Sequence, residues 1–258
     1  MIVLSVIFWI CVAAVMHSYV FYPLLLKLFS AGRETNKVYF EKDDEFPNAS
    51  ILIAAHNEEA IISEKIESIF SGSYLAEKIE VLVGSDNSTD RTNDILRGLE
   101  KKYRQLTLIE FTSRTGKVKI INELSKKARY EILIITDANV LFDVNVLREL
   151  AKHFKNPEIA LVDTNMINKG LKKEGISVQE KTYIESEVFI KSAESKIWGT
   201  MMGPFGGCYA VRKNCFAPVP ANFLVDDFYI NMKVLEKGGK CINEVNAKVF
   251  EDVSNNLR

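Results

Sequence analysis

Polar and acidic side chains follow three apolar runs of this sequence, at the points where predicted strands end. The run from Glu131 to Asn139 reads EILIITDAN, so that Asp137 and Asn139 come directly after a buried-strand pattern. The runs at 50–55 and 79–84 lead in the same way into the segments HNEE and SDNSTD. In open α/β sheets, ligands bind beyond the carboxyl ends of the strands, where an acid can hold a metal ion or a ribose hydroxyl. We therefore expect the three strand ends to line one cleft.

The elements that would position these side chains alternate regularly along the chain. Runs rich in β-branched residues recur about every 27 residues, and helix-like stretches separate them. The runs begin near Ile51, Ile79, Leu106, Ile132 and Ile159. After the first run, apolar residues fall on one helical face, with Asn57 as the expected cap and Glu58 and Glu59 in the first turn. This rhythm predicts a doubly wound α/β domain that begins near Pro47.

The second half of the chain breaks this rhythm. A polar, lysine-rich segment covers Lys169–Glu187, and a stretch of small residues covers Met201–Tyr209. We expect the lysines at 169–173 to form a solvated loop. A final helix is predicted at Asp227–Lys237, ending at Gly238, and a last strand at Lys240–Phe250.

The N-terminal region predicts a membrane-spanning helix. No charged side chain precedes Lys27, and Val3–Leu26 is almost wholly apolar or aromatic. A helix of roughly 24 residues is about 36 Å long, which is enough to cross a hydrocarbon core of about 30 Å. A cleaved signal peptide is the competing interpretation, but the apolar run is too long for one and no basic segment precedes it. Lys27, Arg33 and Lys37 follow the span, so the positive-inside rule predicts a cytoplasmic domain at the cell membrane.

Composition limits the classes of partner. The chain has 258 residues, 47% of them hydrophobic, and a formal net charge of −1. It has no basic stripe of the kind that nucleic-acid binding requires, so nucleic acid is excluded as an expected partner. Cys11 lies in the span, and Cys208, Cys215 and Cys241 are an odd set without CxxC spacing, which indicates reduced thiols rather than a disulfide framework or a zinc site.

Five motifs in order resemble glycosyltransferase family 2, whose members are inverting enzymes with the GT-A fold and nucleotide-sugar donors. The resemblance covers about residues 48–251. SILIAAHNEE is similar to the family's first strand and turn, GSDNSTDRT to its D-D-G-S-T-D segment, and RTGK followed by Asn122 to its G-K-x-x-A-L-N element. TDAN resembles its D-x-D metal motif, and FGGCYAVRK its glycine-rich loop. The implied fold is a Rossmann-like, doubly wound mixed sheet of GT-A type after one N-terminal transmembrane helix.

The resemblance implies a role for each matching residue. Asp227, the second acid of a pair, would be the catalytic base. The donor side would comprise Ala55, Asn57, Glu58, Asp86, Lys117 and Asp137. The acceptor side would comprise Gly206, Gly207 and Asp226, and a Mg²⁺ or Mn²⁺ ion would bind Asp137 and Asn139. The chemistry agrees, because an oxygen-held cation can stabilise a departing diphosphate and a carboxylate can take the proton of an acceptor hydroxyl.

The sequence also departs from the family pattern. Asn139 replaces the second acid of the metal motif, Ser85 replaces the first of the paired acids, and Asn87 replaces a glycine. The Q-x-x-R-W motif of processive members is absent from the chain. Structural explanations stay open beside the functional ones: Asp90 as a helix cap, Gly206 and Gly207 as tight turns, and Lys117 as a solvated helix charge.

Further residues have more than one interpretation. Asp137 could be an ordinary loop acid, and Asp226 could stabilise only the start of a helix. Trp198 could be a core residue or a sugar-stacking platform, and His153 is expected on a helix surface.

These observations predict an anchor at 1–28, a tether at 29–46 and a GT-A domain at 47–258. The nucleotide-sugar half would be 47–142 and the acceptor half, which we expect to be truncated, 143–258. The expected function is transfer of a sugar from a nucleotide-sugar donor, a UDP-sugar by preference, to a glycan or lipid-linked acceptor with inversion. The alternative is a non-catalytic nucleotide-sugar-binding subunit of an envelope polysaccharide complex.

Overall fold

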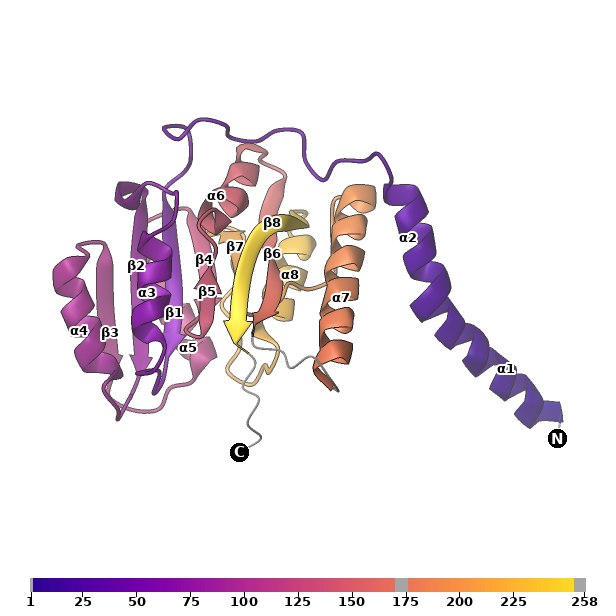
Figure 1. Cartoon of the computed structure of the whole chain (residues 1–258), viewed down its shortest axis with the longest axis horizontal. Helices are drawn as coiled ribbons and strands as arrows, with labels where there is room; N and C mark the ends of the chain where they lie inside the picture. Colours follow the sequence, from indigo (N-terminus) through magenta and orange to yellow (C-terminus); the bar gives the residue numbers. More distant parts are fainter. Residues whose placement is uncertain (1, 170–175, 253–258) are drawn as a thin grey trace.

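Within residues 2–169 and 176–252, which the computed structural model describes, eight strands form one mixed sheet (Figure 1). Their order across the sheet is β3-β2-β1-β4-β7-β6-β8-β5. The first four strands in this order are parallel to one another, whereas β7 is antiparallel to both of its neighbours. The bounds are β1 Ala49–Ala55, β2 Ile79–Asp86, β3 Leu106–Phe111, β4 Ile132–Asp137, β5 Val140–Phe142, β6 Ile159–Lys169, β7 Cys208–Arg212 and β8 Lys240–Asp252.

Helices cover both faces of the sheet, which confirms the doubly wound fold. Apolar side chains of α3, α4 and α6 join one core with Ile51 and Ile53 of β1. Side chains of α5 and α8 join a second core with Leu52, on the opposite face. A central parallel strand is buried on both faces, so its sequence is a continuous apolar run. The helices are α1 Ile2–Met16, α2 Tyr22–Ser30, α3 Ile62–Phe70, α4 Thr92–Lys102, α5 Lys117–Lys127, α6 Val146–Ala151, α7 Ile176–Trp198 and α8 Asp226–Glu236.

The five strands predicted from the apolar runs are all present, as β1, β2, β3, β4 and β6. The strand register places the expected polar ends together. Ala54 lies opposite Asp137 on β4, and Ala55 lies opposite Ser85 on β2. The carboxyl ends of β1, β2 and β4 therefore meet at one edge of the sheet, as the sequence predicts.

A continuous apolar helix precedes the domain. α1 passes through a π-helical turn, His17–Phe21, into α2, so that 29 residues from Ile2 to Ser30 form one candidate membrane span. A helix of this length measures about 43 Å, more than the hydrocarbon core of a bilayer. Within the described chain, no side chain of α1 is buried.

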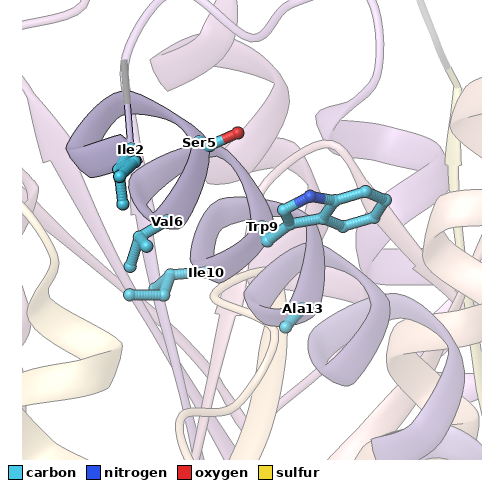
Figure 2. Close-up of a pocket in the computed structure, with 6 residues that line it drawn as sticks. All are labelled: Ile2, Ser5, Val6, Trp9, Ile10 and Ala13. Carbon is cyan, nitrogen blue, oxygen red and sulfur yellow. The ribbon is translucent and has the colours of Figure 1, made fainter.

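One face of α1 carries a shallow hollow that is open to the outside. Figure 2 shows its lining, which consists of side chains of this one helix: Ile2, Ser5, Val6, Trp9, Ile10 and Ala13. Because a single helix forms the wall, the hollow encloses no ligand. We interpret it as the uneven apolar surface that a membrane-spanning helix presents to lipid.

The segment between α2 and β1 contains turns but no helix or strand, and it is docked on the domain. It runs along the edge of the sheet opposite to the carboxyl ends of the parallel strands (Figure 1). Phe46 is buried, and the Lys78 ammonium donates hydrogen bonds to the carbonyl oxygens of Asp43, Asp44 and Phe46 at 3.1, 2.6 and 2.8 Å. The predicted tether is thus held against the protein.

The second half of the domain contains a long helix that the sequence pattern does not predict. α7 covers 23 residues and packs against α2 and β8. Lys169 of the expected lysine-rich loop is instead the last residue of β6, and residues 170–173 lie outside the described residues. The predicted final helix and strand are confirmed as α8 and β8, and Gly238 after α8 has a φ of 80°.

Two local predictions are wrong. Asn57 is not a helix cap, and Glu58 and Glu59 do not lie in a first helical turn, because α3 begins at Ile62 and Ile61 precedes it in the cap position. His153 is not on a helix surface either: it is buried, and its Nε2 lies 2.7 Å from Glu244 Oε2. In both cases a contact with a segment distant in sequence decides the position of the side chain.

Candidate active site

Two loops leave the ends of β1 and β2 and hold each other by reciprocal hydrogen bonds. The Thr89 N–H donates to Asn57 Oδ1 at 2.8 Å, and the Glu58 N–H donates to Thr92 Oγ1 at 2.8 Å. Each loop turns on an asparagine in the left-handed region, Asn57 with a φ of 56° and Asn87 with a φ of 54°. Asparagine is enriched in this region compared with other residues that carry a side chain. Asn57 therefore lies at the expected edge, but its side-chain oxygen orders the neighbouring loop.

Ala55 and Asp90 have structural surroundings in this part of the site. The Ala55 side chain is buried in the core, so a ligand at this position would meet the main chain. Asp90 Oδ1 accepts the Thr92 N–H at 3.0 Å at the start of α4, although Arg91, and not Asp90, occupies the cap position.

Asp86 closes the end of β2 and organises the loop that leads into α5. Its buried carboxylate accepts the N–H groups of Thr115 and Gly116, the latter at 3.0 Å. The Arg114 guanidinium lies 3.6 Å from the same carboxylate. In this structure Asp86 thus fixes residues 114–116, and through them the position of Lys117 at the first turn of α5.

Lys117 is the cation at the centre of the site. Its ammonium lies 2.6 Å from Asp137 Oδ1, so the two expected donor-side residues are brought together. Burial disfavours the charge on Lys117, but Asp137, Asp226 and Asp227 together hold its pKa above the usual value. The helix α5 supplies the cation, β4 one acid and α8 two more. Sequence segments more than 100 residues apart therefore build one charged cluster.

Glu58 belongs to the rim of this cluster. Its pKa is raised, first by burial and then by the negative charges of Asp137 and Asp90. Asp137 is close enough for its charge to contribute to this shift, so Glu58 lies on the same side of the sheet edge as the expected donor-side acid.

The turn from β4 to β5 carries the two expected metal ligands. The Asp137 N–H donates to the Gly207 carbonyl oxygen at 2.9 Å, and the Asn139 amide donates to Glu251 Oε1 at 3.0 Å. Among the described residues, no group of three or more His, Cys, Asp or Glu side chains is assembled around a metal position. One carboxylate and one amide oxygen nevertheless fit a hard cation that takes its remaining ligands from phosphate and water.

The glycine-rich loop before β7 leaves no room for side chains. A Cβ atom on Gly206 would lie 2.8 Å from Asp227 Oδ2, and one on Gly207 would lie 2.2 Å from Met166 Cε. Such distances are shorter than real Cβ contacts, so a side chain at Gly206 would push the Asp227 carboxylate away. Both glycines are therefore needed for close packing, and neither has a positive φ.

Asp227 lies in the first turn of α8, beside the glycine-rich loop. Its Oδ1 accepts the N–H of Phe228 at 2.7 Å. Burial, together with the charge of Asp226, raises its pKa above the usual value, although Lys117 opposes the shift. A carboxylate with a raised pKa is a stronger base than one with the ordinary pKa. Asp227 also lines a hollow that α7 and the loop at 202–204 complete.

Three residues of this region are not identified by the sequence analysis. Lys65 is fully buried beneath the β4–β5 turn, Lys191 is buried on α7 beside the hollow that Asp227 lines, and Glu251 pairs with Asn139. The sequence does contain a sign that Lys65 is buried, because this lysine interrupts the apolar stripe of Ile62, Ile66 and Ile69 on α3. No local sequence pattern identifies Lys191 or Glu251 as residues of the site.

Trp198, for which the sequence allows a core or a sugar-stacking interpretation, is exposed at the end of α7. It is therefore not a core residue.

Comparisons with known proteins agree with this geometry. Residues 50–217 match the sequence profile described as "Glycosyl transferase family 2". A beta-monoglucosyldiacylglycerol synthase of Synechocystis sp. is 32% identical over 114 residues, which cover 43% of this chain and 24% of the relative. A poly-beta-1,6-N-acetyl-D-glucosamine synthase of Staphylococcus epidermidis is 25% identical over 158 residues, which cover 56% of this chain and 38% of the relative. The match thus spans well under half the length of either relative.

Solved structures show the same fold. The mannosyltransferase PcManGT from Pyrobaculum calidifontis, in complex with GDP-Man and Mn²⁺, aligns with a TM-score of 0.76 at 23% identity over 94% of this chain and 68% of that one. TarS of S. aureus, in complex with UDP-GlcNAc, aligns with a TM-score of 0.59 at 17% identity over 81% of this chain and 60% of that one. These similarities identify the GT-A fold. Since the family profile covers well over half of the sequence, the chain belongs to glycosyltransferase family 2.

Proposed function

We propose that this protein is a membrane-anchored glycosyltransferase that moves a sugar from a nucleotide-sugar donor to an acceptor hydroxyl with inversion. The observation that supports the proposal best is the cluster of Lys117, Asp137 and Asp227 at the carboxyl edge of the sheet. It combines a cation for the donor phosphates with a carboxylate of raised pKa for the acceptor. The names of two relatives, a glucosyldiacylglycerol synthase and an N-acetylglucosamine polymer synthase, suggest a lipid or a glycan as the acceptor.

On the acceptor side, Asp227 would act as the general base. Its carboxylate would take the proton of the acceptor hydroxyl while the oxygen attacks the anomeric carbon from the face opposite the diphosphate. The bond from that carbon to the diphosphate oxygen breaks in the same step, and the configuration inverts. Positioned bases of this kind contribute about 10² to 10⁴ to the rate.

On the donor side, Asp86 would recognise the nucleoside while it orders residues 114–116, and Lys117 would pair with the diphosphate. A Mg²⁺ or Mn²⁺ ion, if bound, would be held by Asp137 and Asn139 and would stabilise the negative charge of the leaving diphosphate. The Lys117 ammonium balances the charge of Asp137 in this structure. We favour a UDP-sugar as the donor.

The proposed placement puts the domain on the cytoplasmic side of the cell membrane. Lys27, Arg33 and Lys37 follow the apolar span, and no charged side chain precedes it. Positive residues next to a span are retained in the cytoplasm. Nucleotide sugars would then be available on the side where the domain lies.

Asp227→Asn tests the proposal directly. The variant should lose transfer by about 10² to 10⁴-fold and keep donor binding, because the base touches the acceptor and not the nucleotide. Donor binding is measured by thermal unfolding with UDP, GDP, CDP and their sugars, each with and without Mn²⁺; a ligand at 100 times its dissociation constant stabilises by about 2.7 kcal/mol. Asp94→Asn, at an exposed acid on α4, is the control. Full transfer by Asp227→Asn would exclude Asp227 as the base.

Asn139 supports a second candidate function. It places a neutral amide where the family's metal motif has an acid, and its amide group is engaged by Glu251. A subunit that binds nucleotide sugars without catalysis, within an envelope polysaccharide complex, needs no strong metal site. Transfer or donor hydrolysis that depends on a divalent cation would exclude this candidate.

A further inference from the structure

Two neighbouring hollows lie between the candidate base and the candidate membrane-spanning helix. The hollow that Asp227 lines has a volume of about 290 Å³ and lies between α7, α8 and the loop at 202–204. A second hollow of about 610 Å³ lies between the span and α7, with Tyr19 and Pro23 on one wall and Ser186 on the other. Glu187 and Ile190 line both hollows. The two hollows are therefore neighbours that share part of α7, between the surface of the span and the first turn of α8.

The direction of the span brings the membrane to the correct side. In Figure 1 the parallel strands point downward, and the apolar helix also runs downward from α2 to α1, at the right beyond α7, toward the N-terminus. The carboxyl ends of the strands carry the candidate active site, so a bilayer around α1 would lie toward the end of the molecule at which the site is found. An acceptor embedded in the bilayer would reach the base without leaving the membrane surface.

Packing between the span and α7 makes the span a part of this path. α2 packs along α7, and the Tyr22 hydroxyl donates a hydrogen bond to Glu194, which lines the hollow around Asp227. Leu26 is buried in the same contact region, although the rest of α2 is largely exposed. The wall of the larger hollow is thus formed partly by residues that belong to the membrane span.

The charges around the base select the class of acceptor. Three carboxylates line the inner hollow, those of Glu187, Glu194 and Asp227, against one ammonium, that of Lys191. The Lys191 ammonium already interacts with groups of the protein. Its Nζ lies 3.9 Å from both Asp163 Oδ2 and Glu187 Oε2, and 3.4 Å from the centre of the Phe205 ring. Lys117, the other ammonium near Asp227, is paired with Asp137 and does not line this hollow. The lining of the hollow therefore carries a surplus of negative charge, which repels a phosphate, whereas carboxylates accept hydrogen bonds from neutral hydroxyls.

We propose that the acceptor is a neutral, hydroxyl-bearing membrane lipid, such as a diacylglycerol or an uncharged glycolipid, that enters between the span and α7. Its acyl chains lie against Tyr19, Pro23 and Ile190, and its head-group hydroxyl reaches Asp227. This inference rests on the proposed sugar transfer and adds the class of the acceptor and its route of entry. A polyprenyl phosphate, which is also a lipid but carries charge, does not fit the inner hollow.

The test uses the full chain in phosphatidylcholine vesicles with a radiolabelled donor chosen by the thermal-unfolding screen. The acceptors are dioleoylglycerol, undecaprenyl phosphate and a water-soluble oligosaccharide. We expect label to enter dioleoylglycerol in preference to the other two. Preference for the phosphate or for the soluble glycan would overturn the inference, whereas the absence of any donor binding would instead overturn the proposed function.

Substitutions in the path provide the second arm of the test. Ser186→Trp fills the outer hollow and should lower transfer to dioleoylglycerol by about tenfold or more while donor binding stays unchanged. Phe189→Trp on the same helix, at an exposed residue that lines neither hollow, is the matched control. Glu187→Lys should shift preference toward the anionic lipid. If Ser186→Trp and Phe189→Trp transfer equally well, the acceptor does not enter between the span and α7.

Discussion

At the scale of single residues, Lys65 is a buried cation directly beneath the candidate metal turn. Its ammonium donates hydrogen bonds to Thr136 Oγ1 at 2.9 Å and to the Val140 carbonyl oxygen, and it lies 3.8 Å from the centre of the Phe142 ring. Burial lowers its pKa to about 7. The two acceptors flank residues 137–139, so that Lys65 holds both ends of the turn. Thr136 Oγ1 in turn donates to the Gly207 carbonyl oxygen at 3.0 Å, which links the turn with the glycine-rich loop.

Lys65→Met should show whether Lys65 positions the β4–β5 turn or contributes mainly to the folding stability of the protein. Methionine fills a similar volume without a buried charge, so we expect the melting temperature to be equal or higher. Loss of two hydrogen bonds to the turn should weaken Mn²⁺-dependent donor binding by about tenfold. Both effects are measured by thermal unfolding with and without donor. Lys101→Met, at an exposed lysine on α4, is the control. Unchanged donor affinity in Lys65→Met would show that the turn holds its shape unaided.

The sequence predicts the residues of the site better than their contacts. Asp137 and Lys117 are found from motifs, and the structure joins them at 2.6 Å. The hydrogen bonds of Asn57 could not be predicted, because its partner Thr89 lies 32 residues away in another loop. The same holds for Asp86, whose carboxylate is used by main-chain N–H groups of a loop 29 and 30 residues further on.

At the scale of elements, the glycine-rich loop fixes the distance between β7 and the start of α8. Gly206→Ala would place a methyl group 2.8 Å from Asp227 Oδ2, so the carboxylate has to move. A displacement of about 1 Å at a reacting group can cost up to about 10²-fold in rate. We expect transfer to fall by this order while donor binding is retained, as measured by labelled transfer and by donor-dependent thermal unfolding.

Gly98→Ala is the matched control for this substitution. Gly98 lies within α4, and a Cβ atom there would meet nothing within 4 Å. Replacing a glycine inside a helix with alanine should stabilise the protein by about 0.5–1 kcal/mol and leave transfer unchanged. Equal transfer by Gly206→Ala and Gly98→Ala would mean that Asp227 can shift without loss, and hence that its position is not critical.

The predictability of the elements follows from how they are buried. β1 and β4 pack on both faces, so their sequences are unbroken apolar runs that identify them without tertiary information. α7 packs against α2 on one side and β8 on another, and it also lines two hollows. Its apolar residues therefore form no single stripe, and local periodicity does not predict it. β5, with three residues, is too short to give a pattern.

At the scale of the whole molecule, a buried polar chain ties the tether to the far part of the sheet. Asn36 Nδ2 lies 3.1 Å from His153 Nδ1, and His153 Nε2 lies 2.7 Å from Glu244 Oε2 on β8. Lys152 also pairs with Glu244, at 2.8 Å. The segment that follows the apolar helix is thus connected to the sheet through the 3₁₀ helix Lys152–Lys155, which continues from α6. This connection holds the segment against the domain.

Glu244 should make folding stability depend on acid pH. Burial alone would raise its pKa, but the hydrogen bonds from His153 and Lys152 and from the Asn246 N–H lower it to about 2. The ordinary pKa of a glutamate is higher, at about 4.3. The contribution of Glu244 to folding stability is therefore complete above that pH and is lost as the pH falls toward 2.

Glu244→Gln should reduce the free energy of unfolding by about 2 to 3 kcal/mol at pH 7 and flatten its pH dependence below about pH 4.5, as measured by urea unfolding across pH. Asp94→Asn, at an exposed acid on α4, should leave the profile unchanged. A profile of Glu244→Gln parallel to that of the wild type would show that other carboxylates control the acid transition and that the tether is held without this ion pair.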